Sequence, residues 1–167
     1  MLNKAMLDKL NDQLAKEAYS AYLYYSMVGY FETVNLKGFA NWMLIQAQEE
    51  MTHVHRLFTY INDRGAQVQL SALDQPPNTW ESVEGCVAET LEHECMISAS
   101  INECVTLAMQ ENDHPTNTML QWFVTEQVEE EANANDLLQK VRMIGDNSSG
   151  LYLLDNELSK RSFVNAV

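Results

Sequence analysis

The sequence predicts an all-α protein, a four-helix bundle with one long crossover connection and a short fifth helix near the carboxyl end. Three observations favour this class. Apolar residues recur at helical spacing in four long segments, the 167 residues include only three prolines and six glycines, and the two halves of the chain carry matching patterns of polar residues. One domain is expected over 1–167, with the bundle at about 3–145 and the fifth helix at about 147–158.

The first half of the chain is expected to form a helical hairpin. Helically spaced apolar residues, uninterrupted by proline, predict one helix over about 3–32 and a second over about 39–64. Gly65 suits the end of the second helix, because glycine readily adopts the left-handed conformation of a C-cap. The turn at 35–38 is short, so the two helices should be antiparallel neighbours.

A crossover should connect this hairpin to the second half of the bundle. Residues 66–79 include a Pro-Pro pair and are numerous enough to return along the bundle as a loop. A third helix should begin near 80–82 and continue to about 112, where the segment ending in Pro115 stops it.

The fourth helix is predicted over about 116–144, with Gly145 as its cap. After a polar turn, residues 151–158 could form the short fifth helix. The last residues of the chain are expected to be disordered.

The charge balance limits the classes of partner. The chain carries 24 acidic and 10 basic residues, for a formal net charge of −14, which repels nucleic acid and acidic membranes and favours cations. No apolar run reaches the roughly 20 residues of a membrane span, and the amino terminus lacks the apolar core of a signal peptide. We therefore expect a cytoplasmic protein with neither nucleic acid nor a membrane as a partner.

The three cysteines are not expected to form a disulfide or a metal site. Cys86, Cys95 and Cys104 are nine residues apart in one predicted helix, so successive thiols point to opposite faces. No Cys-x-x-Cys pair is present to hold a soft metal ion. Buried reduced thiols are the simplest interpretation.

A pattern of possible metal ligands occurs twice. It consists of Glu17, Glu50 and His53 in the first half and of Glu94, Gln127 and Glu130 in the second. In each half, 33 residues separate the first glutamate from an i,i+3 pair, and the second half is shifted by 77 residues. Residues three apart lie on one face of a helix, so each pair can be directed at a single point in the bundle.

These carboxylates lie near helix midpoints, where a buried charge needs a partner. An oxygen-rich set with one imidazole suits iron(II) or manganese(II), although zinc also binds such groups. Two metal ions bridged by Glu50 are plausible. Single Glu-x-x-Glu pairs often lie on solvated helix faces. The same 33-residue interval between the first glutamate and the i,i+3 pair in both halves of the chain nevertheless favours the metal site.

The sequence resembles bacterial non-haem ferritins along almost its whole length. The resemblance rests on residues 47–53, 120–131 and 150–152, together with the ligand pattern, and it implies the ferritin-like form of the bundle. The tail after Ser159 departs from the family and is expected to bear little on the chemistry.

The resemblance also implies roles for individual residues. A first iron would be held by Glu17, Glu50 and His53, and a second iron by Glu50, Glu94 and Glu130. Gln127 would lie nearby as a hydrogen-bonding residue. A third iron would be held by Glu49, Glu126 and Glu129, with Glu130 shared. The less favoured alternative is that these three residues belong to a solvated helix face.

The activity implied is oxidation of iron(II) by O2 or H2O2 and storage of iron(III) as a mineral. Tyr24 could donate an electron or a hydrogen bond to the oxidised centre, and Trp122 is a second possible redox donor. Both could instead be ordinary core aromatics. The family forms a hollow homo-oligomeric shell of twenty-four subunits with octahedral symmetry, which we expect here.

Haem is not expected, although Met51 follows Glu50 as in haem-binding relatives, because the second half carries Gln127-x-x-Glu130 where those relatives have Glu-x-x-His. His55 lies on another face of the helix from His53, and His93 and His114 are expected at the surface or in a turn. Two alternatives remain open. One is a rubrerythrin-like peroxidase, which normally adds a four-cysteine domain, and the other is a bundle that binds metal without turnover.

Overall fold

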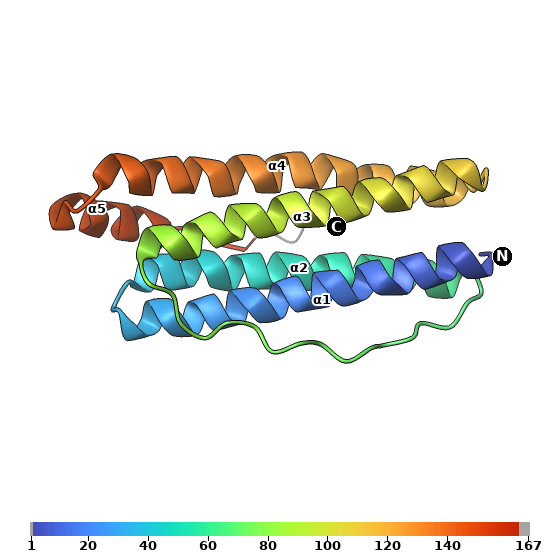
Figure 1. The fold of residues 1–167 in the computed structure, drawn as a ribbon, viewed down its shortest axis with the longest axis horizontal. Helices are drawn as coiled ribbons and strands as arrows, with labels where there is room; N and C mark the ends of the chain where they lie inside the picture. Colours follow the sequence, from blue (N-terminus) through green and yellow to red (C-terminus); the bar gives the residue numbers. More distant parts are fainter. Residues whose placement is uncertain (1, 164–167) are drawn as a thin grey trace.

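The computed structural model describes residues 2–163, which form five helices and no strand. The helices are α1 (Lys4–Thr33), α2 (Lys37–Asp63), α3 (Val83–Gln110), α4 (His114–Ile144) and α5 (Ser148–Leu158). Figure 1 shows the four long helices side by side in an elongated bundle, with α5 at one end. The predicted all-α class and bundle architecture are confirmed.

The connection between α2 and α3 runs the length of the bundle. As a result, α2 and α3 run in the same direction, while α1 with α2 and α3 with α4 form antiparallel hairpins (Figure 1). The predicted long crossover is therefore confirmed. Close packing joins α1 to α2, α3 to α4 and α1 to α3, whereas α5 contacts α2 and α4.

Side-chain caps explain where four of the helices begin. Asn3, Ser82, Asp113 and Asn147 each accept a hydrogen bond from a backbone N–H of the first turn, which otherwise has no partner within its helix. The fourth helix thus begins two residues before the predicted position, because Asp113 caps it and Pro115 fits its first turn. The fifth begins at Ser148, within one residue of the bundle-level prediction of about 147–158 and three residues before the segment 151–158.

The start of α2 is capped by a residue far away in the sequence. Its N-cap Leu36 has no side chain that can accept a hydrogen bond, but Asp155 of α5 accepts from the backbone N–H of Gly38 at 2.7 Å and of Phe39 at 3.0 Å. The helix therefore begins at Lys37, two residues before the predicted start. This cap also fixes α5 against α2, so the short helix is held by polar as well as apolar contacts.

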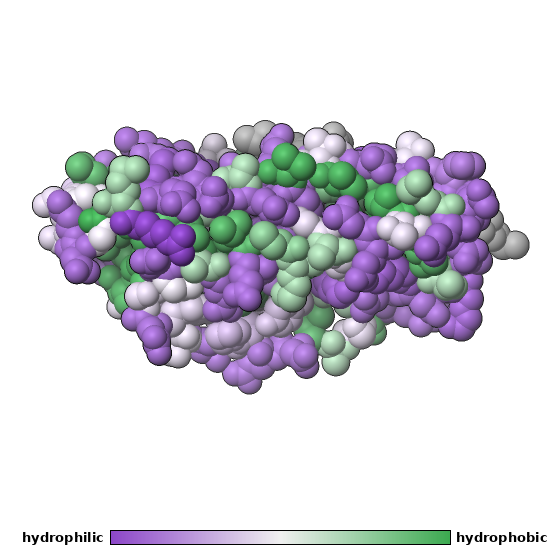
Figure 2. Space-filling model, turned by 45° about the horizontal axis from the view of Figure 1, so that its top comes forward, coloured by the Kyte–Doolittle hydropathy of each residue, from purple (hydrophilic) through white to green (hydrophobic). Residues whose placement is uncertain are grey.

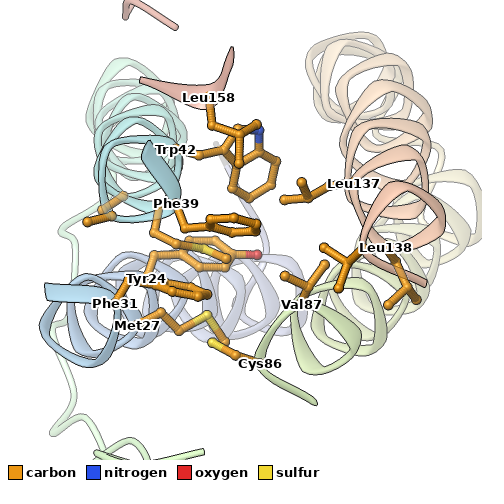
Figure 3. Packing of buried hydrophobic residues seen from close by; sticks show 14 of the residues in the cluster. Tyr24, Met27, Phe31, Phe39, Trp42, Cys86, Val87, Leu137, Leu138 and Leu158 are labelled. Atoms are coloured by element: carbon orange, nitrogen blue, oxygen red, sulfur yellow. The ribbon is translucent and has the colours of Figure 1, made fainter. Parts of the chain in front are cut away.

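Two apolar clusters fill the bundle, one toward the α5 end and one toward the amino-terminal end. In the first cluster, Tyr24 and Trp42 extend from α1 and α2 toward Leu137 of α4, as Figure 3 shows. The buried acidic residues of α1 to α4 lie between the two clusters along the sequence of each helix. The apolar ends thus enclose a polar middle section.

Hydrophilic residues cover most of the face seen in Figure 2, with apolar patches between them. No helix in the described part of the chain is both long and apolar enough to cross a membrane.

Candidate metal centre

Three of the predicted ligands form a compact cluster. Glu17 of α1 and Glu50 and His53 of α2 are buried, and one oxygen or nitrogen from each lies within 4.8 Å of the others. His53 Nδ1 is 3.4 Å from an oxygen of each glutamate. Because Glu50 and His53 are three residues apart, they lie on the same face of α2 and point toward α1.

Glu50 gives the strongest indication of a cation-binding role. Its carboxylate is completely buried, and neither oxygen has a hydrogen-bond partner among the described residues. An unpaired carboxylate in such a place is costly, and a bound cation would offset that cost. The donor set of two carboxylates and one imidazole fits iron(II).

The second-half ligands lie beside this cluster but already have protein partners. Glu94 accepts hydrogen bonds from the Tyr24 hydroxyl and, at 3.1 Å, from Gln127 Nε2. Glu130 accepts one from Gln46 Nε2 at 2.7 Å. All the predicted residues of the paired centre are therefore buried in one region, although only the first-half ligands already form a compact set.

The ionisation of the centre follows from burial and crowding. Burial, helped by repulsion from Glu130, raises the pKa of Glu94 to about 7, and burial raises the pKa of Glu50 well above its usual value. Burial alone would lower the pKa of His53, but the negative charges of Glu50 and Glu17 raise it well above its ordinary value. For Glu17, hydrogen bonding and attraction to His53 outweigh burial and lower the pKa. The centre therefore favours added positive charge.

Two uncharged side chains, those of Gln13 and Ser100, connect Glu17 to Lys16 through hydrogen bonds. Gln13 Nε2 donates to Glu17 at 2.7 Å, Ser100 Oγ donates to Gln13 Oε1 at 2.6 Å, and Lys16 Nζ donates to Ser100 at 2.7 Å. Sequence reasoning missed these residues. The spacing of Gln13 and Glu17, four apart on one helix, is the one signal that could have indicated the first link.

The expectation that His93 lies at the surface or in a turn is wrong. Its side chain is buried on α3, with Nε2 2.8 Å from Ser20 Oγ and its ring at right angles to that of Tyr24. Burial lowers the pKa of His93 to about 4, so the imidazole is neutral at neutral pH. Its ring packs edge-on against the ring of Tyr24, with 6.0 Å between the centroids. His114 is exposed, as predicted.

The other aromatic candidate, Trp122, lies edge-on to the His53 ring with 5.4 Å between centroids. The Arg56 guanidinium covers its face at 4.1 Å from the centroid. Trp122 therefore contacts one of the predicted ligands while remaining partly buried.

The expected ligands of the third iron line one small cavity. Glu49 of α2 and Glu126 and Glu129 of α4 surround about 80 Å³ together with Glu130 and His53, next to the buried cluster. Arg161 lines the same cavity and pairs with Glu49. The tail after Ser159 thus contributes a side chain to this cavity, contrary to the expectation that it bears little on the chemistry. The first tail residues are placed against α2. The expected disorder of the last residues concerns 164–167, which lie outside the described part.

The cysteines are free, as predicted, but only two of them are buried. Cys86 and Cys104 face the core, and Cys95, midway between them, is exposed on the opposite face of α3. Successive thiols therefore point to opposite faces of the helix, as predicted. The expectation of burial is wrong for Cys95.

The raised carboxyl pKa values predict how the metal-free protein responds to pH. Between about pH 4.5 and 7 the folded state binds more protons at Glu94 than the unfolded state, so stability should fall as pH rises through this range. The change from the usual 4.5 to about 7 corresponds to about 3 kcal/mol. Urea unfolding at several pH values would measure the slope.

Glu94→Gln is expected to flatten this slope, and saturating zinc should do the same in the unaltered protein. An unchanged slope in the variant would show that Glu94 does not carry the effect.

The comparisons with known proteins agree with this geometry. A ferritin-like domain model matches residues 7–144. Bacterial non-heme ferritin of Escherichia coli O157:H7 is 38% identical over 95% of this chain and 96% of its own length. A probable bacterial non-heme ferritin-like protein of Haemophilus influenzae is 36% identical over 97% of this chain and 98% of its own length. An open pore ferritin of Archaeoglobus fulgidus superposes with a TM-score of 0.96 at 45% identity, over 97% of this chain and 100% of that structure.

Proposed function

The chain belongs to the ferritin family, and from this premise we propose that it stores iron and oxidises iron(II) at a paired-metal centre in the middle of its bundle. Iron is both the substrate and the stored cargo. The observation that carries the proposal is the buried Glu50 carboxylate, which has no hydrogen-bond partner among the described residues and interacts electrostatically with Glu17 and His53 of the first half and Glu94 of the second. A cation on each side would use both of its oxygens.

The proposed ligands are divided between two metal positions. The first position comprises Glu17, Glu50 and His53, and the second comprises Glu50, Glu94 and Glu130. Glu50 alone belongs to both. Gln127 is proposed to position Glu94, because its amide donates to that carboxylate.

The chemistry supplied by the two ions is the transfer of one electron from each to dioxygen or hydrogen peroxide. The carboxylates favour the resulting iron(III), which is the harder ion. Burial raises the pKa of Tyr24 well above its usual value, so its hydroxyl keeps its proton and its hydrogen bond to Glu94. This bond would hold Glu94 in place while the metal charge changes.

A third iron is proposed in the acidic cavity lined by Glu49, Glu126, Glu129 and Glu130. Its position next to the paired centre suits an ion on the way in or out. We further propose that the subunits form a closed shell of twenty-four copies, as the match to ferritin structures over almost the whole chain supports.

Stopped-flow absorbance on the metal-free protein tests the enzyme proposal. Mixing with increasing iron(II) in air should give a fast phase that saturates at about two iron(II) per subunit, because oxidation requires a filled pair. Glu130→Ala should slow this phase about tenfold or more by removing one ligand of the second position. Glu131→Ala, which removes the same charge one residue away from the site, serves as the control. Oxidation no faster than that of free iron in the unaltered protein would defeat the proposal.

A further inference from the structure

The short tail after α5 is attached to α2. Asn41 Nδ2 donates hydrogen bonds to the carbonyl oxygens of Leu158 at 3.1 Å and Arg161 at 3.0 Å. The Arg161 guanidinium lies over the Trp42 ring, 4.9 Å from its centroid. These contacts place one cationic side chain of the tail at a defined point on the helix.

At that point Arg161 binds two side chains of α2. Its Nη2 is 2.6 Å from Glu49 Oε2, and its Nη1 donates to Gln46 Oε1 at 2.5 Å. The Arg161 and Glu49 side chains are only 23% and 24% exposed, so water screens the pair less than it would at an open surface. The contact is thus a partly buried, charge-assisted hydrogen bond.

The same guanidinium forms part of the wall of the acidic cavity. Four carboxyl groups line this cavity, those of Glu49, Glu126, Glu129 and Glu130, and Arg161 is the permanently charged cation among the lining residues. A metal ion bound to Glu49 would lie within a few ångströms of that positive charge. The repulsion would weaken metal binding, because two cations would share one carboxylate in partly desolvated surroundings.

We propose that Arg161 is a built-in counter-cation of the third metal position, and that a divalent ion can take Glu49 as a ligand only by displacing the guanidinium. The proposal rests on the function proposed above. It makes the carboxyl-terminal tail a determinant of how tightly the cavity holds a cation. The paired centre should be little affected, because Arg161 makes no direct hydrogen bond or ion pair with any of its proposed ligands and is connected to Glu130 only through the Gln46 side chain.

Calorimetric titration of the full-length metal-free protein with zinc, which undergoes no redox change, tests this at one fixed pH. Two tight equivalents per subunit are expected at the paired centre, followed by a weaker third. Arg161→Gln should tighten the third equivalent about tenfold and leave the first two unchanged. Anomalous X-ray scattering at the zinc edge would place the third ion against Glu49.

Lys160→Gln is the matched control, since it removes the same charge from the neighbouring, exposed residue. It should leave the affinity for the third zinc ion unchanged. Arg161→Lys, which retains the charge, should bind the third zinc ion about as tightly as the unaltered protein does. In a Glu49→Gln background, Arg161→Gln should give a much smaller gain in zinc affinity, because no carboxylate remains at that position for the zinc ion and the guanidinium to compete for.

The proposal would be overturned if Arg161→Gln bound the third zinc ion no more tightly than Lys160→Gln does. Absence of the first two equivalents in the unaltered protein would instead count against the paired centre. The two failures are therefore distinguishable in one titration.

Discussion

Replacing Glu50 with Gln is expected to slow iron(II) oxidation about a hundredfold or more, the largest effect of any single substitution in the centre. Glu50 is the one residue assigned to both metal positions, and neither of its two oxygens has a hydrogen-bond partner among the described residues. A neutral amide offers one weak oxygen ligand in place of a charged bridge, so both positions should lose affinity. Stopped-flow absorbance with about two iron(II) per subunit measures the rate.

The control for this variant is Glu92→Gln, which removes a charge from the exposed face of α3. Size-exclusion chromatography would show whether the oligomer is retained. An oxidation rate within about threefold of the control would contradict the bridging role and would favour a bundle that binds metal without turnover.

The same substitution should stabilise the metal-free protein at neutral pH. Burial raises the pKa of Glu50 well above its ordinary value, so the folded state is penalised when the pH is high enough to ionise the group. The amide removes that penalty together with the metal site. A gain in stability with a loss of oxidation would identify Glu50 as a residue kept for function at the expense of stability.

The helices and the paired centre could be predicted because both depend on local spacing. The i,i+3 relation of Glu50 to His53 fixes their common face, and the repeated interval of 33 residues brings the second half to the same level of the bundle. The uncharged partners Gln13 and Ser100 could not be identified in this way. Their role depends on which helix faces which, and amides and hydroxyls are common on any helix.

Contacts between distant segments were the other features that the sequence did not predict. Asp155 caps a helix that begins 118 residues earlier, and Arg161 pairs with Glu49 112 residues before it. A single sequence contains no periodicity that connects such pairs. His93 was misplaced for a related reason, because an imidazole suits either a wet surface or a buried hydrogen bond, and only the packing around Tyr24 decides between them.

Gly38→Ala is expected to detach α5 from the bundle. A Cβ atom at this position would lie 1.6 Å from the backbone oxygen of Asp155, so α5 would have to move away. The move would break the cap that Asp155 provides for α2 and expose Leu154 and Leu158, which are buried against the first apolar cluster. We expect a loss of about 2–4 kcal/mol in unfolding free energy, measured by chemical denaturation.

Gly29→Ala is the matched control, because Gly29 lies within α1 and an added Cβ would meet nothing within 4 Å. That variant should be neutral or more stable by up to about 1 kcal/mol, since alanine is the better helix former. Hydrogen exchange should show loss of protection in 148–158 only for Gly38→Ala. Equal protection in the two variants would contradict the predicted clash.

Gly38→Ala also tests whether the placement of Arg161 depends on α5. The tail continues directly from α5, and its anchor on Asn41 lies three residues beyond Gly38 on α2. If α5 moves away, the guanidinium should leave Glu49, and the third zinc equivalent should tighten as in Arg161→Gln. An unchanged third equivalent would mean that Asn41 and Trp42 hold the tail in place without the docked helix.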